Sequence, residues 1–306
     1  MSEILCIIDG MTDSYFCVDD YPMLSSMHLF QSVRTVPQGY EPESLTCILT
    51  LLGISPIPPF LRGFVEALGA AIPVQKDDLI LRASWFAVEN GVCTYPISAQ
   101  AKLRTNADVR YYQLGDYKSL LILPDMAVNI ESISTCPFYS RFRQTVQDLR
   151  PAGNALLERI FDDNCTNDSC MVLWGQSRMA TLPPFARRAA VICGTGVVRG
   201  IAKLLNMNLI PVSGTTGDID TNLVAKTDTV LRAAEDYPFV LLHINGADEA
   251  AHRQDFEQKK RFLSDVDRLV LKRLLRCGHT VYVTADHATD PITGLHEGAV
   301  QPYFKT

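Results

Sequence analysis

Short apolar runs alternate with longer amphipathic segments along most of the chain, and this alternation constrains the fold more than any other feature. Strands are expected at 4–8, 119–123, 171–174, 189–193, 208–212, 239–244 and 280–284. Helices with apolar residues three and four apart are expected at 197–206, 221–236 and 256–277. Nearly continuous apolar strands separated by helices predict a parallel sheet that is covered on both faces. We therefore predict an α/β protein with a mostly parallel sheet flanked by helices.

The segment 62–165 lacks this regular rhythm. It is richer in Pro and Tyr, as in "CTYPISAQ" at 93–100, and its apolar patterns are broken. A chain of 306 residues is long enough for one large domain or two modest ones. We therefore predict a core domain formed by 1–61 and 166–306, and an inserted, smaller α+β domain at 62–165.

Charge and composition narrow the class of protein. The chain has 28 Lys and Arg residues against 34 Asp and Glu residues, and no basic stripe, which argues against a nucleic-acid partner. No apolar run approaches the roughly 18 to 20 residues of a membrane helix, and the first ten residues, "MSEILCIIDG", do not resemble a signal peptide. The nine cysteines are scattered without a C-x-x-C pair, so we expect a cytoplasmic protein with no disulfide framework.

Polar side chains follow three of the predicted strands at the point where each strand ends. Asp9 follows the first strand, "NGADEAAH" at 245–252 follows another, and Asp286 and His287 follow the last. In open parallel sheets the functional groups gather at the carboxyl ends of the strands. Carboxylate oxygens mixed with imidazole nitrogens suit manganese or zinc. We therefore predict a metal site formed by Asp9, Asp248, His252, Asp286, His287 and His296.

Each of these residues also has a simpler interpretation. Asp9 followed by glycine is typical of a turn after a strand. Asp248 and His252, four positions apart, share one helix face and could bind one ion, but they could also be a helix cap and a solvated histidine. His243 lies inside a predicted strand, which is typical of a hydrogen-bonded core histidine, so it is left out of the predicted site. His279 lies beside a helix end and is interpreted as a surface residue.

A nucleophile for such a site is found in "GYEPESLTCILTLLG", residues 39–53. A site with two metal ions usually serves phosphoryl transfer, and a serine or threonine hydroxyl can act as the nucleophile. Ser44 follows a turn-rich stretch and precedes an apolar helical pattern, which places its hydroxyl at a helix N-terminus that favours phosphate. The alternative is that Ser44 is a helix N-cap only.

The order of several motifs resembles a known family. These motifs are "IIDGMTD", "PESLTCILTLLG", "LRGFVEALGAAI", "VLWGQSRMATLPPF", "SGTTGDIDTN", "DEAAH" and "TADHATD". They resemble the cofactor-independent (2,3-bisphosphoglycerate-independent) phosphoglycerate mutases of the archaeal type, which belong to the alkaline phosphatase superfamily. The resemblance covers most of the chain and is thin between about 95 and 165. It implies an alkaline phosphatase-like α/β fold with two divalent cations, and it implies that the inserted domain at 62–165 binds substrate and closes over it as a lid.

The resemblance also implies a role for individual residues. One cation would be held by Asp9, Ser44, Asp286 and His287, and the other by Asp248, His252 and His296. Ser44 would be the nucleophile that takes the phosphoryl group from 3-phosphoglycerate and returns it to the 2-hydroxyl. Arg62 and Arg82 would contact the substrate phosphate or carboxylate. Manganese is the first expectation for the cations, with zinc, cobalt or magnesium as alternatives, and the expected partner is a small phosphorylated metabolite.

The chain departs from the family pattern next to the serine. Leu45 and Ile48 occupy positions where the family usually has an acidic residue and a histidine or asparagine, and the chain is shorter than typical members. These departures leave two alternatives to the mutase: a phosphatase or phosphotransferase for another small phosphorylated metabolite, and a non-catalytic metal-binding relative. All seven metal and nucleophile positions are retained, which favours phosphoryl chemistry.

Overall fold

The computed structural model describes residues 1–100, 102–137, 144–298 and 300–306. The chain divides into two compact units, which we call the large unit and the small unit. The large unit comprises Met1–Ile57 and Leu182–Thr306, and the small unit comprises Pro58–Thr181. The sequence places the two boundaries after 61 and after 165 instead. The difference of about sixteen residues at the second boundary arises because one strand, described below, pairs within the small unit.

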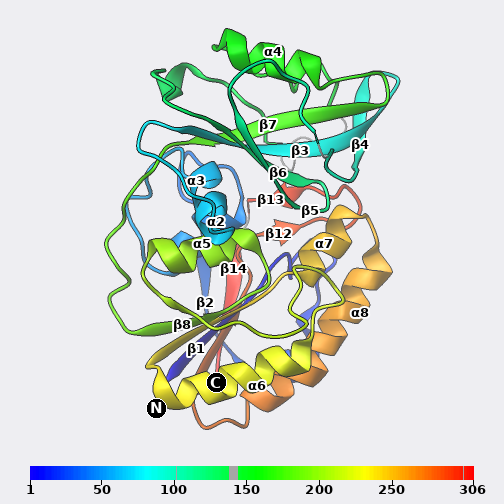
Figure 1. The fold of residues 1–306 in the computed structure, drawn as a ribbon. Helices are drawn as coiled ribbons and strands as arrows, with labels where there is room; N and C mark the ends of the chain where they lie inside the picture. The colour runs from blue at the N-terminus through cyan, green and yellow to red at the C-terminus, as the bar shows by residue number, and fades with distance from the viewer. Residues whose placement is uncertain (101, 138–143, 299) are drawn as a thin grey trace. The chain divides into compact units, whose positions relative to one another are not determined.

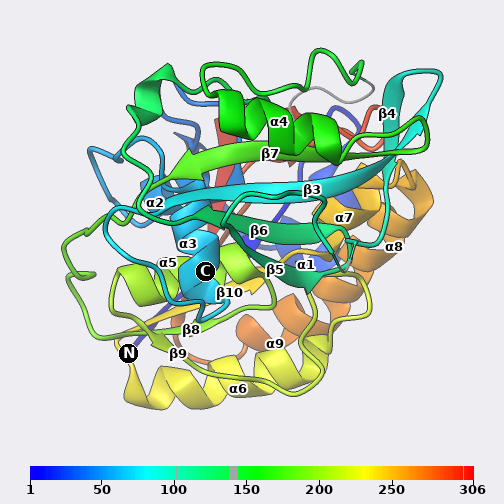
Figure 2. The same cartoon turned by 45° about the horizontal axis from the view of Figure 1, so that its top comes forward.

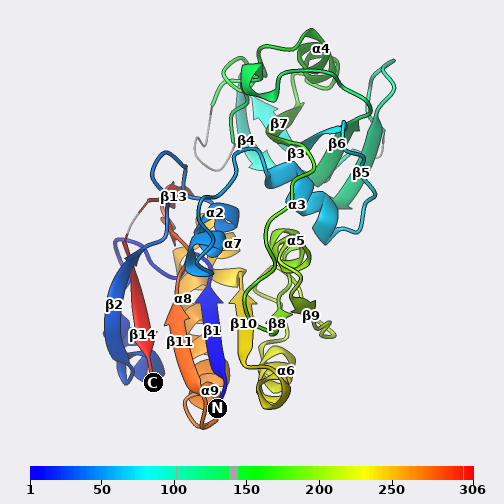
Figure 3. The same ribbon diagram turned by 90° about the vertical axis from the view of Figure 1, so that its left-hand side faces the viewer.

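A seven-stranded sheet forms the centre of the large unit, in the order β2-β14-β11-β1-β10-β8-β9 (Figure 3). The strands are β1 (Glu3–Ile8), β2 (His28–Arg34), β8 (Ala189–Ile192), β9 (Asn208–Leu209), β10 (Phe239–Ile244), β11 (Thr280–Thr284) and β14 (Val300–Lys305). The five strands from β11 to β9 run parallel to one another. The prediction of an α/β protein with a mostly parallel sheet is confirmed, and four of the predicted strands match β1, β8, β10 and β11.

The edge of this sheet next to β11 is antiparallel, which the sequence analysis did not predict. Strand β14 pairs antiparallel with β11, and β2 pairs antiparallel with β14. Strand β2 is almost wholly exposed and lacks the continuous apolar character of the central strands. A half-exposed antiparallel edge does not need the apolar signal by which buried parallel strands are recognised.

Helices cover both faces of the large sheet. They are α1 (Pro22–Ser25), α2 (Ser44–Leu51), α5 (Gly196–Leu204), α6 (Leu223–Asp236), α7 (Gly246–His252), α8 (Phe256–Val266) and α9 (Lys272–Leu274). Residues of α6, α8 and α9 pack with alternate residues of the central strands, including Ile4, Cys6 and Ile8 of β1, into the main apolar core. Helices α6 and α8 and strand β1 can be followed in Figure 1. A π-helical turn at Asp267–Leu271 joins α8 to α9, where the sequence predicted one continuous helix.

The described part of the small unit contains a five-stranded antiparallel sheet and the α-helices α3 (Arg62–Gly69) and α4 (Ala155–Asp163) (Figure 2). Its strands are β3 (Leu79–Glu89), β4 (Val92–Pro96), β5 (Arg110–Gly115), β6 (Lys118–Leu123) and β7 (Ser169–Ser177). The sequence analysis placed 171–174 in the core domain, but β7 pairs antiparallel with β3. An apolar run alone does not reveal which sheet it joins, because that depends on its distant partner.

The small unit also contains a pair of bonded cysteines. Cys165 and Cys170 form a disulfide in the small unit, so the expectation of no disulfide is wrong at this pair. An isolated antiparallel bridge brings their Cα atoms to 4.1 Å, an approach that their spacing in the sequence does not reveal.

None of the helices in the described part of the chain is both long enough and apolar enough to span a bilayer.

Candidate metal centre

Asp9 lies where β1 ends, against the neighbouring strand and helix of the large unit. Its amide donates a hydrogen bond to the carbonyl oxygen of Ile244 over 2.9 Å, which extends the pairing with β10 by one residue. Gly10 follows with φ of +65°, and a β-carbon there would lie 2.7 Å from the Cα of Asp248. Only a glycine fits both the left-handed backbone and this close approach. The Asp9-Gly10 pair therefore brings the end of β1 against the start of α7.

Asp286 and His287 occupy the equivalent position at the end of β11, the other neighbour of β1. Both side chains are wholly buried. The backbone amide of His287 donates to Asp286 Oδ1 over 3.0 Å, which holds the carboxylate in place. His287 Nε2 lies 3.5 Å from both Asp9 Oδ1 and Asp286 Oδ2. The carboxyl ends of adjacent parallel strands thus deliver two carboxylates and an imidazole to one place.

Ser44 is the first residue of α2 and joins this group. Its hydroxyl donates to Asp9 Oδ2 over 3.4 Å, and its oxygen lies 3.2 Å from His287 Nε2. Glu43, the residue before Ser44, occupies the N-cap position of α2. The interpretation of Ser44 as a helix N-cap only is therefore wrong, and its hydroxyl faces the Asp and His residues instead.

A second group is formed by Asp248 and His252 of α7 together with His296. His252 Nε2 lies 3.2 Å from Asp248 Oδ2, and His296 Nε2 lies 3.4 Å from Asp248 Oδ1. The Nδ1 atoms of the two histidines contact backbone carbonyl oxygens, of Gly294 at 2.8 Å and of Pro42 at 2.9 Å. An Nδ1–H that donates to a carbonyl leaves the Nε2 lone pair available, which is the usual arrangement of metal-binding histidines.

Thr289 connects the two groups. Its hydroxyl donates to Asp248 Oδ1 over 2.7 Å and lies 3.3 Å from His287 Nδ1. Thr289 belongs to β12 (Ala288–Thr289), which pairs antiparallel with β13 (His296–Glu297) and sets Thr289 opposite His296. The rings of His287 and His296 are only 3.9 Å apart between centroids. The two groups therefore form one continuous cluster within the large unit.

The buried carboxylates of this cluster favour the binding of cations. Burial raises the pKa of Asp9 well above its ordinary value, and the neighbouring Asp286 and Asp248 raise it further. Burial likewise raises the pKa of Asp286, to which Asp248 adds. Burial would also raise the pKa of Asp248, but His252 and His296 outweigh it and hold that pKa well below its usual range. Three buried carboxylates in contact are costly unless positive charge compensates them.

The pKa values of the histidines in the cluster are shifted as well. Burial lowers the pKa of His287 well below its ordinary value, and the adjacent His296 lowers it further. Burial would lower the pKa of His252 too, but the Asp248 carboxylate outweighs it and raises that pKa to about 9. Asp9 Oδ1 and Asp286 Oδ2 are buried and make no hydrogen bond to any described residue. These unsatisfied carboxylate oxygens lie beside the neutral imidazole of His287, and such a combination fits divalent cations of the manganese or zinc type.

Comparison with known proteins agrees with this chemistry. The family model described as the metalloenzyme superfamily matches residues 24–300.

The chain belongs to the metalloenzyme superfamily.

Among its curated relatives, a 2,3-bisphosphoglycerate-independent phosphoglycerate mutase of Methanococcus aeolicus is 25% identical over 94% of this chain and 84% of the relative. A second protein of that description, from Methanothermobacter thermautotrophicus, is 26% identical over 94% of this chain and 84% of the relative. These relatives are enzymes, and the prediction that the chain is an enzyme resembling this family is confirmed.

Solved structures show the same fold. The PH0037 protein from Pyrococcus horikoshii has a TM-score of 0.71 and 19% identity, covering all of this chain and 87% of the other. The cofactor-independent phosphoglycerate mutase from Thermoplasma acidophilum has a TM-score of 0.53 and 17% identity, covering all of this chain and 90% of the other. At these identities the likeness concerns the fold alone.

The seven predicted metal and nucleophile residues of this metalloenzyme all lie in the cluster just described, whereas the two predicted substrate-binding arginines belong to the small unit. Arg62 and Arg82 both bind the buried carboxylate of Glu66 on α3. Their guanidinium carbons lie 5.0 and 5.2 Å from the centre of the Trp174 ring, within cation–π range. Their contact with substrate stays a prediction.

His243 is the residue that sequence reasoning missed. It is wholly buried on β10, as predicted, but its ring nitrogens make no hydrogen bond to any residue that the structure describes. The interpretation as a hydrogen-bonded core histidine is therefore wrong. His243 Nε2 lies 3.4 Å from Asp9 Oδ2, and His243, Asp9 and Asp286 form one of the groups that could hold a metal ion. Burial lowers the pKa of His243 to about 4, which keeps the imidazole neutral.

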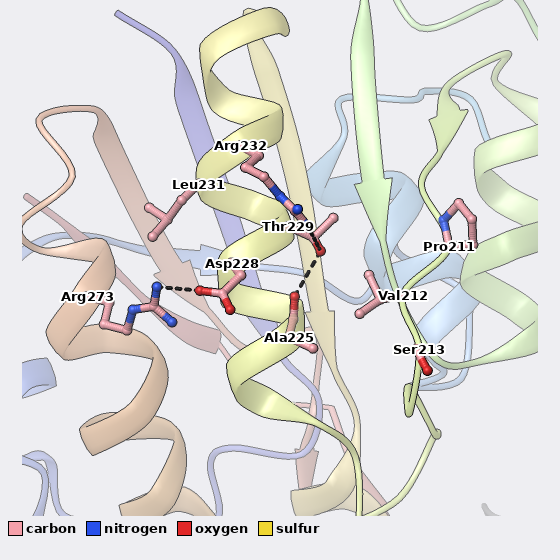
Figure 4. Close-up of a pocket in the computed structure, with 9 residues that line it drawn as sticks. All are labelled: Pro211, Val212, Ser213, Ala225, Asp228, Thr229, Leu231, Arg232 and Arg273. Atoms are coloured by element: carbon pink, nitrogen blue, oxygen red, sulfur yellow. Dashed lines mark hydrogen bonds and ion pairs between the residues drawn. The ribbon is translucent and has the colours of Figure 1, made fainter.

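A separate depression of about 570 Å³ lies on the surface of the large unit (Figure 4). Residues of α6 and of the segment after β9 line much of it. Its two most prominent charged groups, Asp228 and Arg273, bind each other, and Arg232 donates to the Thr229 hydroxyl over 3.2 Å. None of the clustered Asp and His residues lines this depression. We therefore assign the chemistry to the cluster and not to this depression.

Proposed function

We propose that this metalloenzyme transfers a phosphoryl group through Ser44 and interconverts 3-phosphoglycerate and 2-phosphoglycerate. The observation that carries the proposal is the position of the Ser44 hydroxyl, 3.4 Å from Asp9 Oδ2 and 3.2 Å from His287 Nε2. Further support comes from curated relatives that are named phosphoglycerate mutases. The reaction belongs to glycolysis and gluconeogenesis, which places the protein in the cytoplasm under this proposal.

Two groups of side chains would hold the cations, for which manganese is our first choice. Asp9, Ser44, Asp286 and His287 would hold one, and Asp248, His252 and His296 the other. Bound there, two divalent cations supply charge that neutralises phosphoryl oxygens and lowers the pKa of a serine hydroxyl. The mixed carboxylate and imidazole donors, and the unsatisfied oxygens of Asp9 and Asp286, support this assignment.

The transfer takes two steps, first to Ser44 and then to the 2-hydroxyl of the substrate. The Ser44 hydroxyl loses its proton and its oxygen attacks the phosphorus of 3-phosphoglycerate, the bond from phosphorus to the 3-oxygen breaks, and the 3-oxygen takes up the proton that Ser44 gave up. The 2-hydroxyl then attacks the phosphoserine, loses its proton, and releases Ser44 as a hydroxyl again. The hydrogen bond from Ser44 to Asp9 directs the hydroxyl proton toward the carboxylate and leaves an oxygen lone pair for the substrate.

The N-terminus of α2 favours the phosphorylated form of Ser44. Ser44 is the first residue of this eight-residue helix, whose first-turn amides carry a partial positive charge. Phosphate groups bind readily at such helix starts, because the backbone N–H groups there have no partner within the helix. The residue type and its place in the helix therefore support the same role.

A second candidate function keeps the site and changes the acceptor. Leu45 and Ile48 are buried in α2, with exposed fractions of 1% and 0%, and they offer no polar group to the substrate. Without polar groups at these two positions, the phosphoryl group on Ser44 would pass to water or to another small metabolite. The protein would then be a phosphatase or a different phosphotransferase. A non-catalytic metal-binding relative is the third possibility, and the position of the Ser44 hydroxyl beside Asp9 and His287 argues against it.

Conversion of 3- to 2-phosphoglycerate by the purified protein with Mn²⁺, followed by phosphorus NMR, tests the proposal. The wild type should form 2-phosphoglycerate, and Ser44→Ala should lose about a thousandfold or more of kcat. Thr50→Ala is the matched control, because Thr50 lies on the same helix and its hydroxyl only donates to the Thr46 carbonyl oxygen. Equal rates for wild type and Ser44→Ala would overturn the assignment of Ser44 as the nucleophile. Release of free phosphate without 2-phosphoglycerate would favour the second function.

A further inference from the structure

Three buried side chains at the ends of neighbouring strands carry polar atoms that lack a hydrogen bond. These atoms are Asp9 Oδ1, Asp286 Oδ2 and both ring nitrogens of His243, judged against the described part of the chain. Each side chain is at most 1% exposed. One ligand atom from each lies within 4.8 Å of the other two. Because buried polar atoms normally have partners, their coincidence in one small volume points to a group that binds all three.

Strand geometry directs the three side chains to the same face of the sheet. His243 on β10 pairs with Ile7 on β1, and Ile7 pairs with Thr284 on β11. Paired residues on adjacent strands share a face, as do residues two positions apart along one strand. Asp9 and Asp286 follow Ile7 and Thr284 by two positions, so both lie on the face that carries His243.

A hydrogen bond does not explain the position of the His243 ring. Its Nε2 approaches Asp9 Oδ2 to 3.4 Å but does not make a hydrogen bond with it. The backbone of His243 is anchored separately, since the buried amine of Lys226 donates to its carbonyl oxygen over 2.8 Å. A buried imidazole that faces two carboxylates presents a nitrogen lone pair, which is what a divalent cation between those carboxylates requires.

We propose that His243 is a ligand of the cation held by Asp9 and Asp286, to which it supplies a nitrogen from β10. This inference deepens the proposed function, because it rests on the cation site described there. It names a ligand beyond the seven residues already assigned, and it determines which metals the site selects.

A second imidazole next to His287 shifts the metal preference of this site. Imidazole nitrogen suits manganese, zinc and cobalt, whereas magnesium prefers oxygen ligands and keeps several waters. His243 should therefore increase the preference of the Asp9 site for manganese over magnesium. Exchange of His243 for a residue that offers only oxygen should reduce that preference without removing the carboxylates.

Calorimetric titration of the metal-free protein with Mn²⁺ and with Mg²⁺ tests this. The wild type should bind Mn²⁺, and His243→Gln should weaken one Mn²⁺ site by about tenfold to a hundredfold, with a smaller loss for Mg²⁺. His279→Gln is the matched control, since His279 is a mostly buried histidine whose Nε2 contacts Glu235 at 3.5 Å, and it belongs to none of the groups that could hold a metal. Its Mn²⁺ and Mg²⁺ affinities should equal those of the wild type.

A second variant reports coordination directly. His243→Cys places a thiol at the proposed ligand position, and Cd²⁺ should then produce a stronger ultraviolet thiolate-to-metal absorption band than in His279→Cys or in the wild type, whose own free cysteines, such as the exposed Cys17, set the baseline. Anomalous diffraction from crystals of the wild type loaded with Mn²⁺ needs no variant, and it should show an ion within bonding distance of His243 Nε2.

The possible results separate this inference from the proposed function. An unchanged ratio of Mn²⁺ to Mg²⁺ affinity in folded His243→Gln, or an ion bound to Asp9 and Asp286 but remote from the His243 ring, overturns the inference alone. A wild type that binds no divalent cation overturns the cation site and the proposed function with it. A wild type that binds divalent cations, one of them through His243, but transfers no phosphoryl group supports the inference and contradicts the proposed function.

Discussion

The backbone of Gly10 lies directly against the backbone of Asp248. A β-carbon on Gly10 would come within 2.7 Å of the Asp248 Cα and 2.9 Å of its Cβ. Backbone atoms cannot move aside as the end of a flexible side chain can. The distance between the carboxylates of Asp9 and Asp248, and therefore the spacing of the two proposed cations, depends on this contact.

Gly10→Ala should consequently disrupt the metal centre. The left-handed backbone at φ of +65° and the clash together should cost roughly 2 kcal/mol of folding stability or more. We also expect Mn²⁺ affinity to fall by at least about tenfold, since the start of α7 must move. Gly53→Ala is the control, because Gly53 has φ of +75° but no atom near its absent β-carbon. Isothermal titration should find normal Mn²⁺ binding in the control, and a normal result for Gly10→Ala would contradict the prediction.

Thr289→Val should weaken metal binding without removing any ligand. The Thr289 hydroxyl donates to Asp248 Oδ1 over 2.7 Å, and valine has nearly the same shape but no hydroxyl. Loss of such an outer hydrogen bond typically lowers metal affinity by about tenfold to a hundredfold. Thr284→Val controls for the loss of a buried hydroxyl, because Thr284 donates only to backbone carbonyl oxygens. Equal Mn²⁺ affinity in the two variants would show that Thr289 does not orient Asp248.

Mn²⁺ should stabilise the protein, and more strongly as pH rises. The raised pKa values of Asp9 and Asp286 mean that their protonated forms stabilise the metal-free fold below the ordinary carboxyl pKa of 3.8. That stabilisation is lost as pH rises through the raised values, and deprotonation creates the ligands that Mn²⁺ needs. At a hundredfold excess over Kd, Mn²⁺ should add about 2.7 kcal/mol, which corresponds to roughly 5 to 10 °C in Tm.

Thermal unfolding followed by circular dichroism measures this effect. EDTA should reverse it, and Asp286→Asn should reduce it. A Tm that Mn²⁺ leaves unchanged, or a shift that grows as pH falls, would argue against buried carboxylate ligands.

Glu66 should make the small unit sensitive to acid. Burial would raise the pKa of Glu66, but Arg82 and Arg62 outweigh it and lower that pKa from 4.5 to about 2. A carboxyl with a lowered pKa stabilises the fold fully above pH 4.5, and the stabilisation is lost as pH falls toward 2. The loss should be on the order of 3 kcal/mol at most.

Urea unfolding at a series of pH values can measure the Glu66 effect by tryptophan fluorescence. Both tryptophans, Trp85 and Trp174, belong to the small unit, so the signal reports that unit. Glu66→Gln should be less stable at neutral pH, because it leaves the buried charge of Arg82 without its partner, and should show a flatter response between pH 4.5 and 2. The exposed Glu89→Gln on β3 should behave like the wild type.

Much of the large unit could be predicted from its sequence. Strands β1, β10 and β11 are apolar on both faces, a property that is local and visible in the letters of 4–8, 239–244 and 280–284. Parallel strands end at the same edge of a sheet, so the polar residues that follow each strand had to converge. Residue type and position at the strand ends were therefore enough to predict that Asp9, Asp286 and His287 lie close together.

Only the tertiary structure decided the rest. Three features depend on partners that no local pattern identifies: the sheet that β7 joins, the antiparallel edge formed by β14 and β2, and the Cys165–Cys170 disulfide. His243 has the local signature of a core residue, and its proximity to Asp9 and Asp286 follows from the register of three strands distant in sequence. Local periodicity determines which residues are buried, whereas the pairing of distant strands determines which buried groups meet.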